Sequence, residues 1–285
     1  MSTLILGTDG FLGQKLYLFS KENFPNLKII GNSQKYYSES TLKGMLYRAK
    51  PNLIFNCIAM TNASQCEESP EEANWVNGEI PSILATYCKK EGARLIHLST
   101  DAVMDINKSL KCESDNPKPS DTYGMSKLAG ETALMEMQCN YLICRVNFFG
   151  LSNKKQSLLD FFVKNIINKR ECYGYTNVLF NPISVDNLVK TLWKLEELRI
   201  RGLIHITGDD VISKYEFGKE VEAIISGENN FVIPHELSIK EARNIKDLSL
   251  CSCKLRNVIQ TPFKDWKTEL KKQLKGIGDS YEDRN

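Results

Sequence analysis

The chain has 285 residues, of which 42% are hydrophobic, and its formal net charge is +2 at pH 7. This length and apolar content allow one or two domains. The near-neutral charge excludes the strong field that attracts nucleic acid or an acidic membrane surface. No run approaches the roughly 18–20 apolar residues that span a bilayer, and the N-terminus lacks signal-peptide features. We expect a cytoplasmic protein without nucleic-acid or membrane partners.

Nine cysteines and three histidines raise the question of a metal centre or disulfides. The cysteines are scattered singly except for Cys251 and Cys253, and no CxxC pair occurs. The histidines are isolated, and His97 and His205 lie within apolar runs that resemble strands. We expect reduced thiols, as in a reducing cytosol, and no metal site.

Short apolar runs alternate with longer amphipathic segments in the first half of the chain. Strands are predicted at Thr3–Leu6, Leu27–Gly31, Leu53–Cys57, Arg94–Leu98 and Tyr141–Arg145. Helices are predicted at Leu12–Glu22, Thr41–Ala49, Glu79–Glu91 and Tyr123–Met137. This alternation is typical of βαβ units and predicts an α/β fold, a Rossmann-type doubly wound parallel sheet.

The second half is less regular. Helices are predicted at Leu158–Asn168, at Val185–Leu198, from Ser213 to Ile225 and at Pro262–Leu274, with one more strand at Leu203–Ile206. Ser213 and Glu216 form a capping-box pair. We expect a Rossmann domain of residues 1–147 plus about 180–208 and a smaller C-terminal α+β domain of about 148–179 and 209–275. Residues 276–285 should form a flexible tail.

A glycine-rich turn follows the first predicted strand and opens the first helix. Gly7, Gly10 and Gly13 have the spacing GxxGxxG. Such glycines allow a tight turn and a close backbone approach to a pyrophosphate, at which the helix N-terminus points its N–H groups. The strand–turn–helix context favours a dinucleotide site over a turn without a ligand.

The second predicted strand leads into Asn32, Ser33 and Lys35, where an NAD-preferring site usually places an acid for the ribose hydroxyls. Ser33 can hydrogen-bond a 2′-phosphate and Lys35 can neutralise one. We expect NADPH as the cofactor, with NADH also accepted. The alternative is that Lys35 is an ordinary solvated lysine.

Tyr123 and Lys127 are spaced to share one face of a helix, in the pattern YxxxK. A nearby cation is expected to lower the pKa of the phenol, which could then exchange a proton with a carbonyl oxygen during hydride transfer. The pattern gains weight from its place after Thr100 and Asp101, at the carboxyl end of the fourth strand, where such sheets bind ligands. Thr100 could donate a hydrogen bond to the same carbonyl.

With these motifs the sequence resembles the extended short-chain dehydrogenase/reductases, and most nearly the group of dTDP-4-dehydrorhamnose reductase and related sugar-nucleotide reductases. The resemblance covers nearly the whole chain. Beyond the glycine turn and YxxxK it is carried by 51–56 with Ala59 and Thr61, by 92–101, 123–131, Arg145, 181–188, 202–208 and 213–217.

The resemblance implies a reductase of a nucleotide-linked 4-keto-6-deoxysugar, a substrate pocket in the second half and a homodimer. Tyr123 would be the proton donor, Thr100 would polarise the keto group and Lys127 would hold the nicotinamide ribose. The resemblance also implies that the pyrophosphate is contacted by Gly10, Phe11 and Leu12. The nicotinamide half would be contacted by Ala59, Met60 and Thr61, and the substrate by Asp101 and Phe148.

The sequence departs from the group at several positions, so the resemblance does not identify the sugar. The group usually has Thr-Ser-Trp where this chain has Val146, Asn147 and Phe148. It usually has Ala-Val-Asp where residues 62–64 read Asn-Ala-Ser, and an Asp where this chain has Cys251. A nucleotide-sugar epimerase remains an alternative. So does a non-catalytic NADP-binding regulatory subunit, since that of methionine adenosyltransferase resembles the same group. The intact Thr100, Tyr123 and Lys127 favour catalysis.

Overall fold

The computed structural model describes residues 2–227, 230–237, 246–260, 265–275 and 277. The chain divides into two compact units. The first comprises Met1–Asp105, Glu113–Val146 and Val189–His205, and the second comprises Ile106–Cys112, Asn147–Leu188 and Ile206–Asn285. The expected flexible tail, apart from Ile277, and the predicted helix start at Pro262 lie outside the described residues.

Six strands and the helices around them make up the first unit. The strands are β1 (Ser2–Leu6), β2 (Lys28–Asn32), β3 (Leu53–Asn56), β4 (Arg94–Thr100), β5 (Asn140–Val146) and β10 (Gly202–Ile206). The helices are α1 (Phe11–Asn23), α2 (Glu39–Ala49), α3 (Ala63–Glu68), α4 (Pro70–Asn74), α5 (Ile80–Glu91), α6 (Thr122–Met137) and, from Val189 onward, α8 (Val185–Glu197). A π-helical turn at Trp75–Glu79 and a 3₁₀ turn at Asp101–Val103 complete it.

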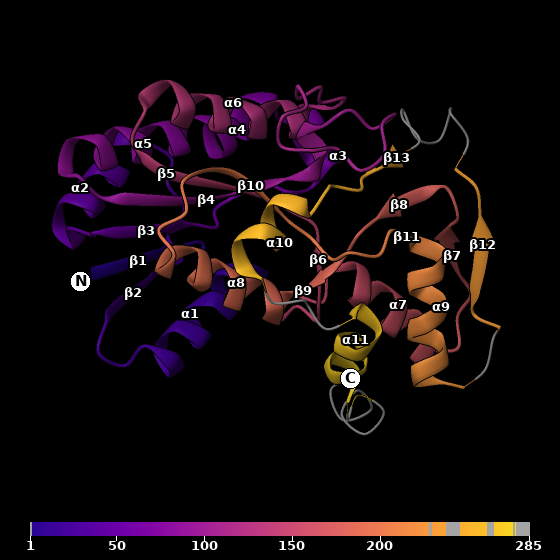
Figure 1. The fold of residues 1–285 in the computed structure, drawn as a ribbon. Coiled ribbons are helices and arrows are strands. Elements are labelled where there is room, and N and C mark those ends of the chain that lie inside the picture. The colour runs from indigo at the N-terminus through magenta and orange to yellow at the C-terminus, as the bar shows by residue number, and fades with distance from the viewer. Residues whose placement is uncertain (1, 228–229, 238–245, 261–264, 276, 278–285) are drawn as a thin grey trace. The chain divides into compact units, whose positions relative to one another are not determined.

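The sheet has the strand order β10-β5-β4-β3-β1-β2, and the pairs from β2 to β5 are parallel. Helices α2, α4, α5 and α6 cover one face, and α1 and α8 cover the other (Figure 1). All seven residues of β4 are buried, as expected for a central parallel strand covered on both faces. The predicted Rossmann-type fold is confirmed. Its strand order reverses between β1 and β3, the place where such sheets bind ligands.

The described residues of the second unit form short strands and four helices. Its strands are β6 (Phe148–Phe149), β7 (Cys172–Tyr175), β8 (Val178–Phe180), β9 (Ile183–Ser184), β11 (Ile212–Ser213), β12 (Val232–His235) and β13 (Lys246–Asp247). Its helices are α7 (Leu158–Ile167), α9 (Lys214–Ile225), α10 (Cys253–Ile259) and α11 (Trp266–Leu274). The core includes Phe162, Phe217 and Trp266. The predicted capping box of Ser213 and Glu216 at α9 is confirmed.

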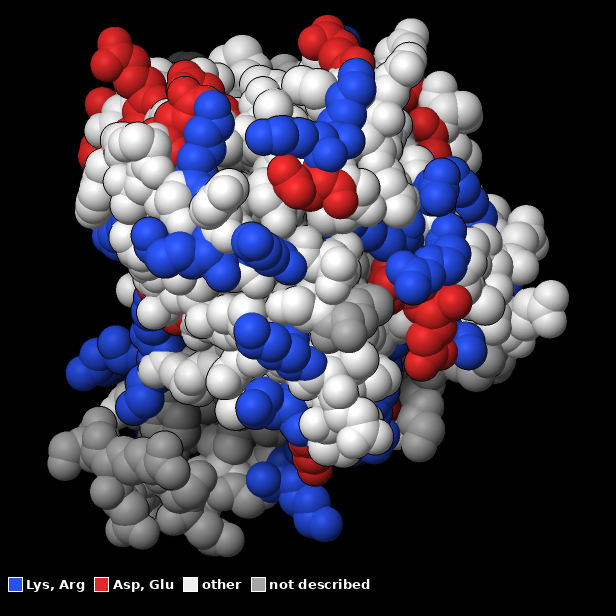
Figure 2. Space-filling view, turned by 90° about the vertical axis from the view of Figure 1, so that its left-hand side faces the viewer, with Lys and Arg blue, Asp and Glu red and all other residues white. Residues whose placement is uncertain are grey.

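Charges of both signs are spread over the surface. On the face shown in Figure 2, Lys and Arg side chains lie in separate groups, with acidic side chains and uncharged surface between them. Among the helices of the described residues, none combines the length and the apolar character that crossing a bilayer requires.

Candidate active site

The glycine turn joins β1 to α1 in the first unit. Gly7 has φ +79°, in the left-handed region that favours glycine, and its N–H donates to the carbonyl of Asn32 over 2.8 Å. A Cβ on Gly13 would lie 2.1 Å from the Gly7 carbonyl oxygen, so a side chain cannot fit there. Gly10 caps α1 without a side-chain hydrogen bond, and Phe11 and Leu12 follow as its first turn. The turn therefore brings bare backbone to a helix N-terminus, the arrangement that suits an anion.

Asn32, Ser33 and Lys35 lie where β2 ends. The Asn32 side-chain oxygen accepts hydrogen bonds from the Tyr36 hydroxyl at 2.8 Å and from the Gln34 N–H at 3.2 Å, so it shapes the local turn. Ser33 and Lys35 are exposed. The first acidic residue after the strand is Glu39, in the first turn of α2. The strand end thus presents a hydroxyl and a cation.

Asn77 fixes the loop that follows β3. It is fully buried in the π-helical turn, where its side chain bonds the Met60 N–H at 2.9 Å and the Met60 carbonyl at 3.0 Å. It also reaches the Ser126 hydroxyl of α6 at 3.0 Å. Ala59 and Met60 are partly buried, and Thr61 is exposed. The sequence analysis missed Asn77, although π-helical turns inside helices often mark functional sites.

Tyr123 and Thr100 are brought together at the carboxyl end of β4. The phenol and the Thr100 hydroxyl share a hydrogen bond, and Thr100 donates in turn to the Asp101 carboxylate at 2.9 Å. Asp121 caps α6 by accepting from the Gly124 N–H at 2.8 Å, which fixes the turn that carries Tyr123. The side chains of Tyr123, Thr100 and Asp101 are therefore linked in series by hydrogen bonds.

The expected lowering of the Tyr123 pKa is wrong for this structure. Burial raises the pKa of the phenol, and this effect outweighs the Thr100 hydrogen bond, which lowers it. The Lys127 ammonium instead donates to the Leu98 carbonyl at 2.6 Å. Tyr123 is consequently protonated at neutral pH.

Lys127 is buried beneath the site with two further polar side chains. Its Nζ lies 3.5 Å from His97 Nε2, and His97 Nδ1 lies 3.1 Å from the Asn56 amide. Burial lowers the pKa of Lys127 to about 8, although Glu131 opposes the shift, and burial also lowers the pKa of His97 well below its usual range. His97 is thus neutral. It is a buried strand residue, as the sequence indicated, but its contact with Lys127 was missed.

A buried ion pair holds α6 on the sheet. The Arg145 guanidinium of β5 bonds the Glu131 carboxylate of α6 through Nη2 at 2.7 Å and through Nε at 3.0 Å. Ser99 donates to the same carboxylate from β4. Glu131 and Arg145 are 0% and 1% exposed, so the pair is shielded from water and salt. It links the helix of Tyr123 and Lys127 to both neighbouring strands.

The remaining predicted site residue lies in the second unit. Phe148 is partly buried and forms β6, which pairs with β9 in parallel. Within the described part of the chain, no group of three or more His, Cys, Asp or Glu side chains is arranged to hold a metal ion. None of the nine cysteines forms a disulfide in the described part of the chain.

Comparison with known proteins places these features in a family. The model described as "RmlD substrate binding domain" matches residues 1–278. A probable low-salt glycan biosynthesis reductase, Agl14, from Haloferax volcanii is 30% identical over 64% of this chain, and the match spans 62% of that protein. The dTDP-4-dehydrorhamnose reductase of Sinorhizobium fredii is 27% identical over 77% of each chain. Methionine adenosyltransferase 2 subunit beta from Xenopus laevis is 28% identical, over 75% of this chain and 69% of that protein.

Solved structures agree in fold. A dTDP-4-dehydrorhamnose reductase from Bacillus anthracis, in complex with NADP, superimposes with a TM-score of 0.87 at 22% identity, covering 96% of this chain and 98% of the other. An orthologue from Clostridium acetobutylicum gives 0.86 at 25% identity, covering 97% and 99%. The predicted relation to sugar-nucleotide reductases is confirmed, and the predicted oxidoreductase class and NADP cofactor are those of these relatives. The chain belongs to the RmlD substrate-binding domain family.

Proposed function

We propose that this chain is an NADPH-dependent reductase of a nucleotide-linked 4-keto-6-deoxysugar. The observation that carries the proposal is the hydrogen-bonded chain of Tyr123, Thr100 and Asp101 at the carboxyl end of β4, with Lys127 buried on the same helix as Tyr123. A protonated phenol supplies the proton that reduction of a keto group consumes. The names of the relatives support the substrate class.

The residues of the first unit fit a dinucleotide phosphate. A side chain on Gly13 would collide with the Gly7 carbonyl, and Gly10 opens α1 without a capping side chain, so backbone N–H groups can approach a pyrophosphate. Ser33 and Lys35 suit a 2′-phosphate, which an acid at this place would repel. When bound, NADPH supplies the hydride.

The protein side chains would hold the keto group and move one proton. Tyr123 would donate its phenolic proton to the keto oxygen, and Thr100 would turn its hydroxyl from Asp101 to the same oxygen. Lys127 would hold the nicotinamide ribose. Asn77 would position Met60, Ala59 and Thr61 beside the nicotinamide through its two bonds to Met60. Phe148 would contact the sugar.

Two alternatives remain. The match to methionine adenosyltransferase 2 subunit beta favours a regulatory NADP-binding subunit, which need not turn over a sugar. An epimerase shares the fold: UDP-glucose 4-epimerase from Thermotoga maritima gives a TM-score of 0.84 at 16% identity. Tyr123 and Thr100 would serve either reaction, so net consumption of NADPH is the observation that separates the two.

The first experiment mixes the full chain with NADPH and a panel of dTDP-, UDP-, GDP- and CDP-linked 4-keto-6-deoxysugars, and follows the loss of nicotinamide absorbance. We expect one substrate to be reduced. Tyr123→Phe should lower kcat by about a hundredfold or more, because the proton donor is lost. Tyr47→Phe, at an exposed position of α2, is the matched control and should leave the rate unchanged.

Tight NADPH binding without reduction of any ketosugar would contradict the reductase proposal. Isomerised sugar without net NADPH consumption would favour the epimerase. A rate that is equal in wild type and Tyr123→Phe would remove Tyr123 from the mechanism while leaving reduction intact.

A further inference from the structure

Three thiols meet in the second unit, and none of them is assigned a role in the proposed reaction. The Cys251 thiol contacts both the Cys112 thiol and the Cys253 thiol. The Cys253 N–H donates to the Cys251 sulfur at 3.4 Å. Cys112 and Cys251 are partly buried and Cys253 is exposed, so small reagents can reach the cluster. These cysteines come from segments that are far apart in the sequence.

The backbone sets Cys112 beside Cys251. Lys111 and Leu250 form a parallel β-bridge, and the Cys251 N–H donates to the Lys111 carbonyl at 2.8 Å. In parallel register, Cys112 and Cys251 are the next facing pair. Neighbouring strands lie about 4.8 Å apart, which falls within the Cα separation of about 4.4–6.8 Å that a disulfide needs.

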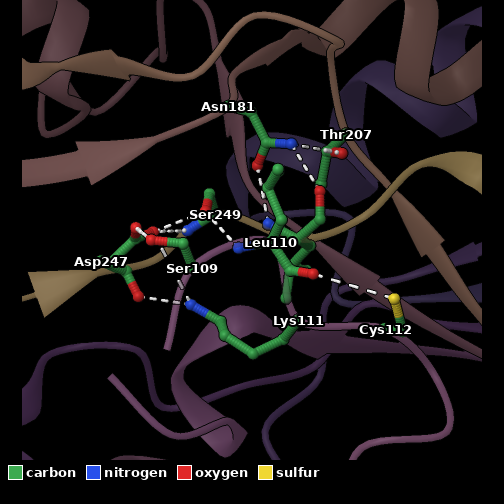
Figure 3. A network of polar contacts seen from close by, with 9 residues as sticks. Ser109, Leu110, Lys111, Cys112, Asn181, Thr207, Asp247 and Ser249 are labelled. Carbon is green, nitrogen blue, oxygen red and sulfur yellow. Dashed lines mark hydrogen bonds and ion pairs between the residues drawn. The ribbon is translucent and has the colours of Figure 1, made fainter. Parts of the chain in front are cut away.

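Polar contacts hold both strands of this bridge in place (Figure 3). Lys111 is 1% exposed, and its ammonium donates to the Asp247 carbonyl. The Leu110 N–H donates to the Ser249 hydroxyl at 2.9 Å. The Leu250 N–H donates to the Asn181 side-chain oxygen at 3.0 Å. Because several bonds fix the backbone on both sides, the two thiols stay close without any rearrangement.

We propose that Cys112 and Cys251 are a redox modification site that forms a reversible disulfide. The oxidant is a hydroperoxide. One thiol takes the terminal oxygen of the hydroperoxide and becomes a sulfenic acid, while the rest of the oxidant leaves as an alcohol, or as water when the oxidant is hydrogen peroxide. The second thiol then attacks the sulfenic sulfur, forming the S–S bond and releasing water. A thiol reductant restores both thiols. The proposal does not depend on the reductase activity.

Cys253 is the competing partner. It is exposed, and Arg256 Nη2 lies 3.6 Å from its sulfur, a neighbour that favours a reactive thiolate. However, it is only two residues from Cys251, and a disulfide between them would close a small ring. The facing pair across the bridge has the better backbone geometry. Burial raises the pKa of the Cys251 thiol to about 11, so oxidation should take a long exposure rather than a brief one.

The test uses the full-length protein, reduced and then freed of reductant. It is incubated with hydrogen peroxide at mildly alkaline pH, its remaining thiols are alkylated, and it is digested with trypsin without reduction. We expect peptide 112–127 linked to peptide 247–254, lighter than their sum by two hydrogen atoms and separated again by dithiothreitol. In the wild type, Cys112 and Cys251 should lose their reactivity toward the alkylating agent together.

Variants assign the bond. Cys112→Ser and Cys251→Ser should lose the linked peptide, while Cys253→Ser should keep it. Cys139→Ser, which removes a partly buried thiol of the first unit, is the matched control and should also keep it. The proposal is overturned if the wild type yields no linked peptide, if the only product is an internal bond within peptide 247–254, or if Cys251→Ser gives as much linked product as the wild type. The alkylation readout on the wild type needs no variant to fold.

Discussion

Lys127 carries a charge that disfavours the folded state. Its side chain is 1% exposed, and burial lowers its pKa from the usual 10.5 to about 8. Because the unfolded chain binds this proton more tightly, the penalty is fully present below pH 8 and is relieved as the pH rises from 8 to 10.5. A shift of this size corresponds to about 3 kcal/mol of unfolding free energy.

Replacing the charge should therefore change how stability depends on pH. Relative to Lys127→Met, the wild type should gain about 3 kcal/mol of unfolding free energy as the pH rises from about 7 to about 10.5. Urea denaturation of both proteins across this pH range measures the difference between their unfolding free energies. The contributions of the other titrating groups are common to both proteins and cancel in this difference. Lys89→Met, at an exposed position of α5, is the control. A difference that stays flat with pH would show that Lys127 keeps an ordinary affinity for its proton.

Single residues differ in how far the sequence reveals them. The spacing of Tyr123 and Lys127 was enough to predict that they share a helix. The direction of the Tyr123 pKa was predicted wrongly because burial, a tertiary property, raises it by more than the Thr100 hydrogen bond lowers it. Asn77 was missed because its partner Met60 is 17 residues away and their bond depends on the fold. The sequence offers no local pattern for such a pair.

Helix α6 depends on the Glu131–Arg145 pair for its place on the sheet. Removing one partner of a buried pair leaves the other charge without compensation in a medium of low dielectric constant. Glu131→Gln should thus lower the unfolding free energy by about 3 kcal/mol, measured by urea denaturation at neutral pH. Glu136→Gln, on the exposed face of the same helix, should change it little. Equal effects of both variants would mean that Arg145 finds other partners.

The long elements were predictable and the short ones were not. Each predicted strand and helix has a counterpart among the described residues, the last helix from Trp266 onward, because apolar periodicity reports burial on a sheet or helix face. The sequence did not reveal the π-helical turn, the short helices α3, α4 and α10, or the short strands β6, β7, β8, β9, β11, β12 and β13. The turn has a physical cause in Pro81, which lacks the N–H that would bond the Asn77 carbonyl, while the Ile80 N–H bonds Trp75. Pro81 inside the predicted helix was the available signal.

The division of the whole chain follows long-range contacts that the sequence does not display. Residues 106–112 lie between two segments of the first unit but belong to the second. Their contacts are with the segment around Asp247 and Leu250, through Lys111 and the β-bridge. Periodicity reports a segment's own burial and says nothing of its partner. The predicted domain boundaries, which gave 106–112 no separate place, stay a prediction.

NADPH binding should stabilise the first unit in particular. If the nucleotide binds at the glycine turn, a ligand concentration of a hundred times Kd adds about 2.7 kcal/mol to the free energy of every local or global unfolding that disrupts the site. Hydrogen exchange followed by mass spectrometry should then show slower exchange in peptides from 2–105, 113–146 and 189–205, most strongly in those covering Gly7–Gly13. NADH at the same concentration should protect less, because the 2′-phosphate that Ser33 and Lys35 would bind is missing. Protection confined to peptides of the second unit would place the nucleotide elsewhere, and equal protection by both nucleotides would remove Ser33 and Lys35 from cofactor selection.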